Sequence, residues 1–431
     1  MGKVVKQHWE AALDAGLPRR ARQPCTYEAY LPDPLMGRPI KLDGDVAAEV
    51  ADAESAIIQL NASAATLADT EALARLLLRA ESVASSRIEG LEVGGRRLLL
   101  AEAARDLGDE PRDVTATEVL GNIDAMVWSL GTLTGTEAIS VAHLLEMHRR
   151  LLRGTRMASH AGQVRQVQNW IGGNSYNPCS AEFVPPPPDA VHRLLEDLCD
   201  FCNGDSLPAV AQAAVIHAQF ETIHPFVDGN GRIGRALIHL VLRRRSLTPR
   251  VLPPISLILA TRSKEYVDGL RATRYLGAAD SPQAHKGLNE WIALFAAACR
   301  RAVDDALAFE VRTRALDQAW RAQLGQVRAK SAVDLLIRAL PGAPLVTVNG
   351  AADLIGRSFQ ATNAAITRLA EAGILLPVKV GRRRNRAFEA SDVLQAFTDL
   401  ERQLASPAGD TRVSGPARPV PRRRRARGNP G

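Results

Sequence analysis

The feature that most constrains this chain is the segment His224–Arg235, HPFVDGNGRIGR, which lies between two stretches with the apolar spacing of helices. Pro225 disfavours helical geometry at the residue before it, so we expect the upstream helix to end at His224. Gly229 and Gly231 allow positive φ and a close approach of the backbone, so consecutive N–H groups can face an anion. The segment therefore predicts a helix, an anion-binding turn and a second helix.

The charged side chains of this segment suit the chemistry of phosphate groups. Arg232 and Arg235 are three residues apart, so they share one face of the second helix and could hold the outer phosphates of a nucleotide. Asp228 supplies an oxygen ligand for Mg²⁺, which needs only one or two protein carboxylates. With His224 as a base, these groups predict phosphoryl-group transfer.

Other interpretations of the segment fit the sequence less well. GNGRIG has the spacing of a dinucleotide-binding fingerprint, but a helical pattern precedes it and no acid follows Arg235 until Glu265. No G-x-x-x-x-G-K-[ST] sequence occurs, which excludes a Walker-type ATPase on motif grounds. A purely structural glycine turn would make the histidine, the aspartate and both arginines coincidental.

At this point the residues resemble the Fic family, whose signature His-Pro-Phe-x-Asp-Gly-Asn-Gly-x-x-x-Arg is met at every position. The resemblance extends over residues 45–300 and implies a helical core that transfers AMP from ATP to a Tyr, Thr or Ser hydroxyl of a target protein or of the chain itself. It implies that His224 is the base, that Asp228 holds Mg²⁺ and that Phe226 anchors the loop. The nucleotide-binding residues that it implies are Gly229, Asn230, Gly231, Arg232, Gly234 and Arg235, with Tyr266 near the adenine.

The resemblance also bears on the donor and on target docking. In the family, Lys in place of the second glycine is associated with phosphorylation, and here Gly231 is intact, which favours AMP transfer; UTP, GTP and a CDP-linked donor stay open. The segment QNWIGGNSYNPCSAEFVPPPP is similar to the family's target-docking flap. Its residues Glu182, Phe183, Val184 and Pro185 would pair with the target backbone as an added strand.

A second resemblance concerns regulation. The helical pattern over about residues 72–90 ends in Ser85-x-x-x-Glu89-Gly90, which is similar to the inhibitory [S/T]-x-x-x-E-[G/N] motif of some Fic proteins. A Glu89 carboxylate that met Arg235 would occupy the guanidinium that the γ-phosphate needs. The alternative is an ordinary glycine-terminated helix end with an exposed glutamate. In some relatives the same glutamate assists removal of AMP, so activity in both directions stays open.

The C-terminal part of the chain predicts a winged helix-turn-helix over about residues 331–396. Its recognition helix would span Ser358 to Ala372 after a turn at Gly356, and its wing would carry an arginine-rich tip. The side chains expected to contact DNA are Gln360, Asn363, Thr367, Arg382, Arg383, Arg384 and Arg386. A DNA-binding regulator whose Fic core senses nucleotide is therefore the second hypothesis for this chain.

These patterns predict a mainly α protein with a Fic helical core, a β-hairpin flap and a C-terminal α+β winged helix-turn-helix domain. The expected division is an N-terminal helical region at 1–112, the catalytic core at 113–305, a connecting helix at 306–330, the winged helix-turn-helix at 331–403 and a basic disordered tail at 404–431. Seven of the last 26 residues are arginine, so most of the net charge of +7 belongs to this tail.

Composition limits the setting of the protein. No run of about 18 apolar residues occurs and the first residues lack the apolar core of a secretory signal, so we expect a cytoplasmic protein that does not bind membranes. The five cysteines are scattered and odd in number, which predicts reduced thiols rather than a disulfide framework. The sequence leaves the oligomeric state and the identity of the target open.

Overall fold

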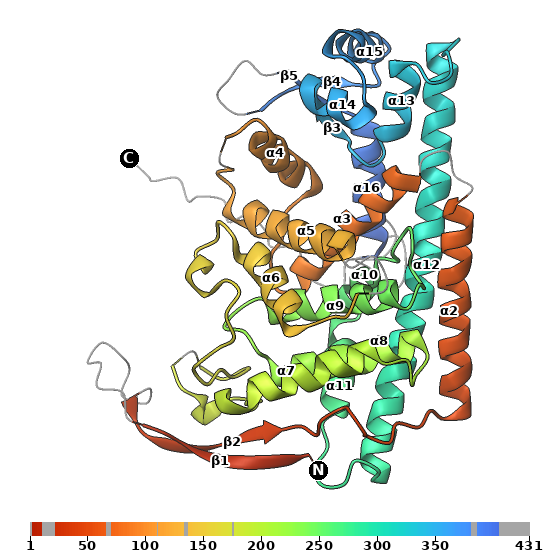
Figure 1. Cartoon of the computed structure of the whole chain (residues 1–431). Helices are drawn as coiled ribbons and strands as arrows, with labels where there is room; N and C mark the ends of the chain where they lie inside the picture. Colours follow the sequence, from red (N-terminus) through yellow and green to blue (C-terminus); the bar gives the residue numbers. More distant parts are fainter. Residues whose placement is uncertain are drawn as a thin grey trace, which may run out of the picture.

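The computed structural model describes residues 2–10, 22–65, 70–109, 111–132, 137–174, 176–380 and 386–404, and the structural statements below refer to these residues. Most of them are helical (Figure 1). The helices of the main body are α2 (Gly44–Ala65), α3 (Thr70–Ile88), α4 (Gly95–Asp106), α5 (Val114–Thr132), α6 (Val141–Leu152), α7 (Pro188–Asn203), α8 (Ala209–Ile223), α9 (Asn230–Arg244), α10 (Ile255–Thr261), α11 (Ser263–Ala272) and α12 (Pro282–Leu324).

Two central helices organise this body. All 15 residues of α8 are buried, including its polar residues Gln212, His217, Gln219, Glu221 and Thr222, so the helix is enclosed by the core on every side. The first 13 residues of α9 are buried as well, and the helix packs against α8. In Figure 1 the two helices lie one above the other in the middle of the molecule, with α12 crossing their ends. The loop that joins α8 to α9 is therefore held by the core on both sides.

The long helix α12 links this body to a smaller C-terminal unit. Its 43 residues correspond to roughly 65 Å of helix. Its first part packs along α2 and α8, whereas Trp320 near its end belongs to the core of the C-terminal unit. The elements of that unit are α13 (Ala332–Ala339), β3 (Leu345–Thr347), α14 (Val348–Ile355), α15 (Phe359–Glu371), β4 (Leu376–Lys379), β5 (Arg386–Glu389) and α16 (Ser391–Leu404).

The C-terminal unit is connected to the main body through α12 and also packs against its helix α4. Its antiparallel sheet has the strand order β3-β5-β4. Arg96 of α4 forms an ion pair of 2.7 Å with Glu389 of β5. Ala103 of α4 is buried in one cluster with Val380 and Ala387. The predicted wing tip Arg382, Arg383 and Arg384 and the tail 405–431 lie outside the described residues, as does the side chain of Arg386.

The N-terminal segment differs from its prediction. The region 1–112 was expected to be helical as a whole, whereas β1 (Lys3–Trp9) and β2 (Cys25–Leu31) form an antiparallel pair before α2. Exposed and less exposed residues alternate along most of both strands, which is the period of an extended chain and not of a helix. The apolar spacing of helices begins at about residue 45 in the sequence, and α2 begins at Gly44.

The prediction of reduced cysteines is wrong for one pair. Cys25 of β2 and Cys179 form a disulfide although 154 residues separate them in the sequence. The hairpin lies along the loop that contains Cys179, and sequence spacing carries no sign of this approach. Cys199, Cys202 and Cys299 are free thiols buried in the main body. Among the described helices, none is both long enough and apolar enough to cross a membrane.

The disulfide makes a testable prediction about stability. A Cys25→Ser variant should unfold at lower denaturant concentration than the parent, with a loss of roughly 2–4 kcal/mol, because the bond restrains a long loop in the unfolded chain. Urea unfolding followed by circular dichroism, with and without dithiothreitol, measures the difference. Cys179→Ser removes the other half of the bond and should show the same loss, and reduction of the parent should abolish the difference. Equal stability of the parent and Cys25→Ser under oxidising conditions would contradict the prediction.

Candidate functional site

The site begins where α8 ends. His224 is the C-terminal cap of α8 and has left-handed backbone angles, φ 49° and ψ 61°, as the proline after it led us to expect of a helix end. A non-glycine residue in this region is strained by about 1 kcal/mol or more and persists only when its surroundings hold it. The imidazole consequently leaves the helix axis and stands at the start of the loop.

Arg165 holds this strained turn in place. Its side chain is 2% exposed, and its Nε donates to the carbonyl oxygen of His224 at 2.9 Å. Its backbone N–H donates to the carbonyl of Pro225 at 2.9 Å, and its Nη2 donates to Pro186 at 2.5 Å. Asn169 adds bonds from Nδ2 to the carbonyls of His224 and Phe226. Sequence analysis assigned no role to Arg165, because nothing in its neighbourhood marks it as buried.

The protonation of His224 follows from these neighbours. Burial, and next the positive charge of Arg165, lower the pKa of His224 from 6.5 to about 4. The imidazole is therefore neutral at pH 7 and has a lone pair with which to accept a proton. This is the state that a general base requires.

The start of α9 forms a cradle for an anion. Gly229 caps the helix with φ 81°, and a Cβ there would lie 2.6 Å from Leu151 Cδ2, so only glycine fits. Asp228 Oδ1 accepts from the backbone N–H of Gly229 at 2.7 Å. The amide of Asn230 bonds to both the N–H and the carbonyl of Phe226, at 2.8 and 2.9 Å. The side chain of Asn230 thus closes the loop, and its contact with an α-phosphate stays a prediction.

Arg232 carries unused hydrogen-bonding capacity within this cradle. Its side chain is 2% exposed, and its Nη2 donates to Asp228 Oδ2 at 3.3 Å. Its Nε and Nη1 are buried and have no hydrogen-bond partner among the described residues. Buried donors without partners are costly, so a bound anion such as a nucleotide phosphate would satisfy them.

A metal site would have one protein ligand here. Asp228 is 45% exposed, so an oxygen of its carboxylate can face solvent. No cluster of three or more His, Cys, Asp or Glu side chains suited to a metal occurs in the described part of the chain. Mg²⁺ fits this arrangement because it keeps its waters and takes further oxygens from the phosphates.

His148 supports the cradle and was missed by sequence analysis. Its Nδ1 accepts from the N–H of Gly162 at 3.1 Å, so its Nε2 carries the proton and donates to the carbonyl of Asp228 at 3.0 Å. Its ring stacks on Phe226 at 3.8 Å, and Phe226 is completely buried. Burial lowers the pKa of His148 to about 4, so this arrangement is stable at neutral pH. The sequence feature that could have identified His148 is its position on the buried face of α6.

The second arginine of the segment is already occupied. Arg235 is 1% exposed and donates from Nη2 to Glu89 Oε1 at 2.8 Å and to the carbonyl of Ser85 at 2.8 Å. Its Nε donates to Ser85 Oγ at 2.9 Å. A Cβ on Gly231 would lie 1.9 Å from Glu89 Oε1, so the missing side chain of Gly231 leaves room for the carboxylate. The structure thus brings the two motifs together at one guanidinium.

The charge of Glu89 is set by these partners. Burial alone would raise the pKa of Glu89, but the charges and hydrogen bond of Arg235, helped by Arg232, outweigh it and leave the pKa lowered. Glu89 is therefore ionised at neutral pH. Its side chain is 38% exposed, whereas that of Arg235 is 1% exposed, so the ion pair joins a partly exposed anion to a buried cation.

Tyr266 and Gly234 lie behind Arg235. The hydroxyl of Tyr266 bonds to His217 Nε2 at 2.8 Å and to Arg235 Nη1 at 3.4 Å, and the residue is 3% exposed. The structure gives Tyr266 a role in supporting Arg235, whereas the adenine contact stays a prediction. A Cβ on Gly234 would lie 2.7 Å from the buried carboxyl of Glu221, whose pKa burial raises to about 7. Gly234 therefore acts through packing.

The predicted flap, residues 182–185, forms backbone hydrogen bonds with Ile171 on one side and with β2 on the other. Phe183 exchanges backbone hydrogen bonds with Ile171, the carbonyl of Val184 accepts from the N–H of Tyr30 at 2.9 Å, and Glu182 pairs with Arg271 at 2.6 Å. Val184 and Pro185 are buried. The flap forms one isolated β-bridge, between Phe183 and Ile171, and is supported by β2. The predicted hairpin is therefore shorter than expected.

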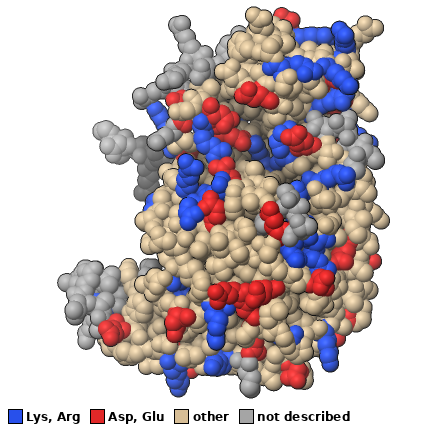
Figure 2. Space-filling view, in the orientation of Figure 1, with Lys and Arg blue, Asp and Glu red and all other residues tan. Residues whose placement is uncertain are grey.

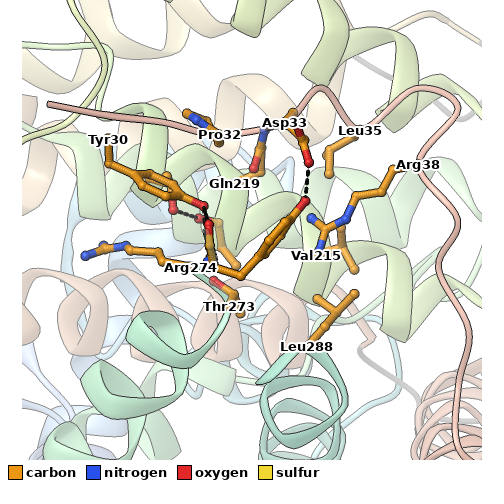
Figure 3. A pocket seen from close by; sticks show the side chains of 13 residues that line it. Tyr30, Pro32, Asp33, Leu35, Arg38, Val215, Gln219, Thr273, Arg274 and Leu288 are labelled. Carbon is orange, nitrogen blue, oxygen red and sulfur yellow. Dashed lines mark hydrogen bonds between the residues drawn. The ribbon is translucent and has the colours of Figure 1, made fainter. Parts of the chain in front are cut away.

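A small hollow lies behind this flap (Figure 3). Tyr30 and Asp33 line it from one segment and Arg274 from another, and the hydroxyl of Tyr275 donates to Asp33 at 2.5 Å. Arg274 also lies over the ring of Phe183, 3.5 Å from its centroid. The contacts around the hollow therefore hold the N-terminal hairpin and the flap against α8 and α12.

Comparison with known proteins gives this geometry a context. Residues 47–130 match the Fic/DOC family N-terminal region, and residues 138–242 match the Fic/DOC family. Protein adenylyltransferase fic-1 of Caenorhabditis elegans is 32% identical over 186 residues, which are 42% of this chain and 33% of that protein. Protein adenylyltransferase Fic of Drosophila willistoni is 34% identical over 139 residues, which are 32% of this chain and 26% of that protein. The chain thus spans about a third or less of the length of these relatives.

A solved structure extends the likeness beyond these segments. The crystal structure of a Fic family protein from Desulfovibrio desulfuricans G20 has a TM-score of 0.50 and 22% sequence identity, and it covers 82% of this chain and 97% of that chain. At this level of identity the comparison shows a shared fold.

The environment of His224 leads to a prediction that nuclear magnetic resonance can check. The ring signal of His224, assigned by its absence in a His224→Gln variant, should titrate near pH 4. In Arg165→Met the pKa should rise, because a like charge that opposes protonation is gone. Arg149→Met, which removes an exposed arginine paired with Glu146, should leave the titration unchanged. A His224 signal that titrates near 6.5 in the parent would contradict this account.

Proposed function

This chain belongs to the Fic/DOC family, and from that premise we propose that it transfers AMP from ATP to a Tyr, Thr or Ser hydroxyl of a target protein or of itself. The observation that carries the proposal is that a neutral His224 and Arg232 lie close together in the chain on either side of the loop. The buried Nε and Nη1 of Arg232 have no hydrogen-bond partner among the described residues. One group can accept a proton and the other can hold a phosphate, and they lie at opposite ends of the same short loop.

In this proposal the loop aligns the reacting groups for a single nucleophilic displacement at the α-phosphorus of ATP. The target hydroxyl loses its proton to the imidazole of His224 while its oxygen attacks the α-phosphorus of ATP. The bond from that phosphorus to the β-phosphate oxygen breaks, and pyrophosphate leaves. Arg232 and the backbone N–H groups at the start of α9 neutralise and orient the phosphates, since electrostatic preorganisation supplies most of the catalysis in phosphoryl transfer. Asp228 would hold Mg²⁺, which offsets phosphate charge when bound.

We further propose that Glu89 is a brake on this reaction. The four contacts of Arg235 with Ser85, Glu89 and Tyr266 use the donors that a γ-phosphate would need. A nucleotide must displace the carboxylate of Glu89 to gain the pair with Arg235, so basal activity is low. In the proposal the same carboxylate also assists removal of AMP, in which water attacks the phosphorus, the bond to the target oxygen breaks and AMP leaves. This activity is measured as loss of label from a modified protein.

The proposal predicts opposite effects of two substitutions. With α-³²P-ATP and Mg²⁺, Glu89→Gly should raise label transfer to protein on the order of tenfold or more, because Arg235 is released. Adding His224→Ala to Glu89→Gly should reduce transfer by about 10²–10⁴, the usual worth of a general base. Transfer is measured on gels with purified protein alone and with cell lysate.

Controls separate the donor from the chemistry. UTP, GTP and a CDP-linked donor labelled at the α-phosphate are run beside ATP, since the resemblance favours ATP without excluding them. Glu265→Gly removes a similarly exposed glutamate on α11 and should change nothing. If Glu89→Gly were no more active than the parent while binding ATP equally well, the brake would be rejected.

A second candidate function rests on the C-terminal unit. We propose that it is a winged helix-turn-helix that binds duplex DNA. The order α13-β3-α14-α15-β4-β5 and the left-handed Gly356 between α14 and α15 support this fold. Gln360 and Thr367 are exposed on α15, whereas Asn363 is half-buried. Figure 2 shows Lys and Arg side chains gathered on the visible face of this unit, at the top of the view.

The DNA proposal has its own test. In fluorescence anisotropy at low salt, the triple variant Arg382→Ala, Arg383→Ala, Arg384→Ala should lose most of the affinity of the full chain for duplex DNA, since each phosphate contact contributes to binding. Arg300→Ala with Arg301→Ala removes two exposed cations of α12 and is the control for net charge. A full chain that does not bind duplex DNA at low salt would contradict the proposal.

A further inference from the structure

The helix that carries the brake contains a second, fully buried acid. Glu81 of α3 is 1% exposed and lies far from solvent in the main body. Its Oε2 accepts from the backbone N–H of Ser256 at 2.8 Å, and its Oε1 accepts from Ser256 Oγ. His239 Nε2 of α9 lies 3.0 Å from the same Oε1. A buried carboxylate persists only when such partners compensate the loss of water, so these contacts define one position for Glu81.

The spacing of polar residues relates Glu81 to the brake. Glu81 and Ser85 of α3 and Glu89 just after its end are spaced four residues apart, so they follow one face of the helix. They meet α9 in reverse order: Glu81 lies against His239, and both Ser85 and Glu89 bond to Arg235, four residues earlier in the chain. The two helices thus run in opposite directions along a shared polar seam.

The geometry explains why such a brake needs an anchor. α3 ends at Ile88, so Glu89 stands just beyond the last helical residue, where helix ends commonly fray. Asn122 of α5 donates to the carbonyl of Ser82 at 2.9 Å and to Ser86 Oγ at 3.3 Å, which restrains the opposite side of α3. Apolar packing permits small slides along a helix, whereas a hydrogen-bonded buried carboxylate permits one register. Two turns separate this fixed point from Glu89.

We propose that Glu81 is a positioning residue for the brake: its bonds to Ser256 of α10, beside its approach to His239 of α9, fix the position of α3 so that Glu89 meets Arg235. This inference rests on the proposed function, because it assigns how the inhibitory contact is held. If Glu81 had a purely structural role instead, any substitution of Glu81 would lower AMP transfer. A positioning role makes the loss of Glu81 raise activity while the catalytic residues stay intact.

The test compares four full-length proteins in the AMP-transfer assay. Glu81→Met keeps the approximate volume and removes the acceptors, so transfer should rise on the order of tenfold over the parent, the effect expected from loss of a hydrogen bond to a charged group. In the Glu89→Gly background, Glu81→Met should give no further rise, since no brake is left to misplace. A fall in both backgrounds would overturn the proposal and show a structural role.

Two further variants keep the test decisive. Ser256→Ala removes only the Oγ donor and should raise transfer by less than Glu81→Met, so it decides the matter if Glu81→Met does not fold by circular dichroism. Glu71→Gln changes an exposed acid of the same helix, paired with Arg75, and should leave transfer unchanged. Activation by Glu89→Gly without activation by Glu81→Met or Ser256→Ala would reject the anchor alone. Absence of activation by Glu89→Gly would reject the brake and the anchor together.

Discussion

The guanidinium of Arg235 is the point on which the site depends. A charge that is 1% exposed must be compensated, and here Ser85, Glu89 and Tyr266 supply the acceptors. If Glu89 left without a replacement, a buried cation would lose its counter-ion, which is costly in a protein interior. The phosphate of a nucleotide can restore that balance. In the proposed function the carboxylate of Glu89 and the nucleotide are therefore alternative partners of Arg235.

This exchange requires a rigid frame around the loop. The wholly buried α8 and the buried first 13 residues of α9 fix the ends of the loop, and Arg165 holds His224 in a backbone conformation that it would not adopt alone. Gly229 and Gly231 have no space for a Cβ, because Leu151 and Glu89 fill it. The same close packing that shapes the loop thus also leaves room for the carboxylate of Glu89.

Sequence patterns predicted the part of this arrangement that depends on local spacing. The helix end at His224 follows from Pro225, and the approach of Glu89 to Arg235 followed from a motif resemblance that the structure matches in geometry. Side chains brought in from distant segments could not be predicted in this way. Arg165, His148 and Glu81 each form a hydrogen bond with a residue at least 59 positions away in the chain, and no periodicity in the sequence indicates such contacts.

The N-terminal segment shows the same limit for the fold. The strands β1 and β2 and the Cys25–Cys179 bond depend on the hairpin packing beside the flap, which local propensity does not encode. Conversely, the helices of the main body were predictable because apolar spacing alone determines which face is buried. The site is therefore better predicted where one segment contains it than where the tertiary fold assembles it.

Nucleotide affinity tests the central claim most directly, because it does not depend on the target protein. Isothermal titration calorimetry would compare ATP and AMP binding to the parent and to Glu89→Gly. If Glu89 and the terminal phosphate compete for Arg235, Glu89→Gly should bind ATP on the order of tenfold more tightly and bind AMP with unchanged affinity. Equal gains for ATP and AMP, or no gain for ATP, would contradict the account.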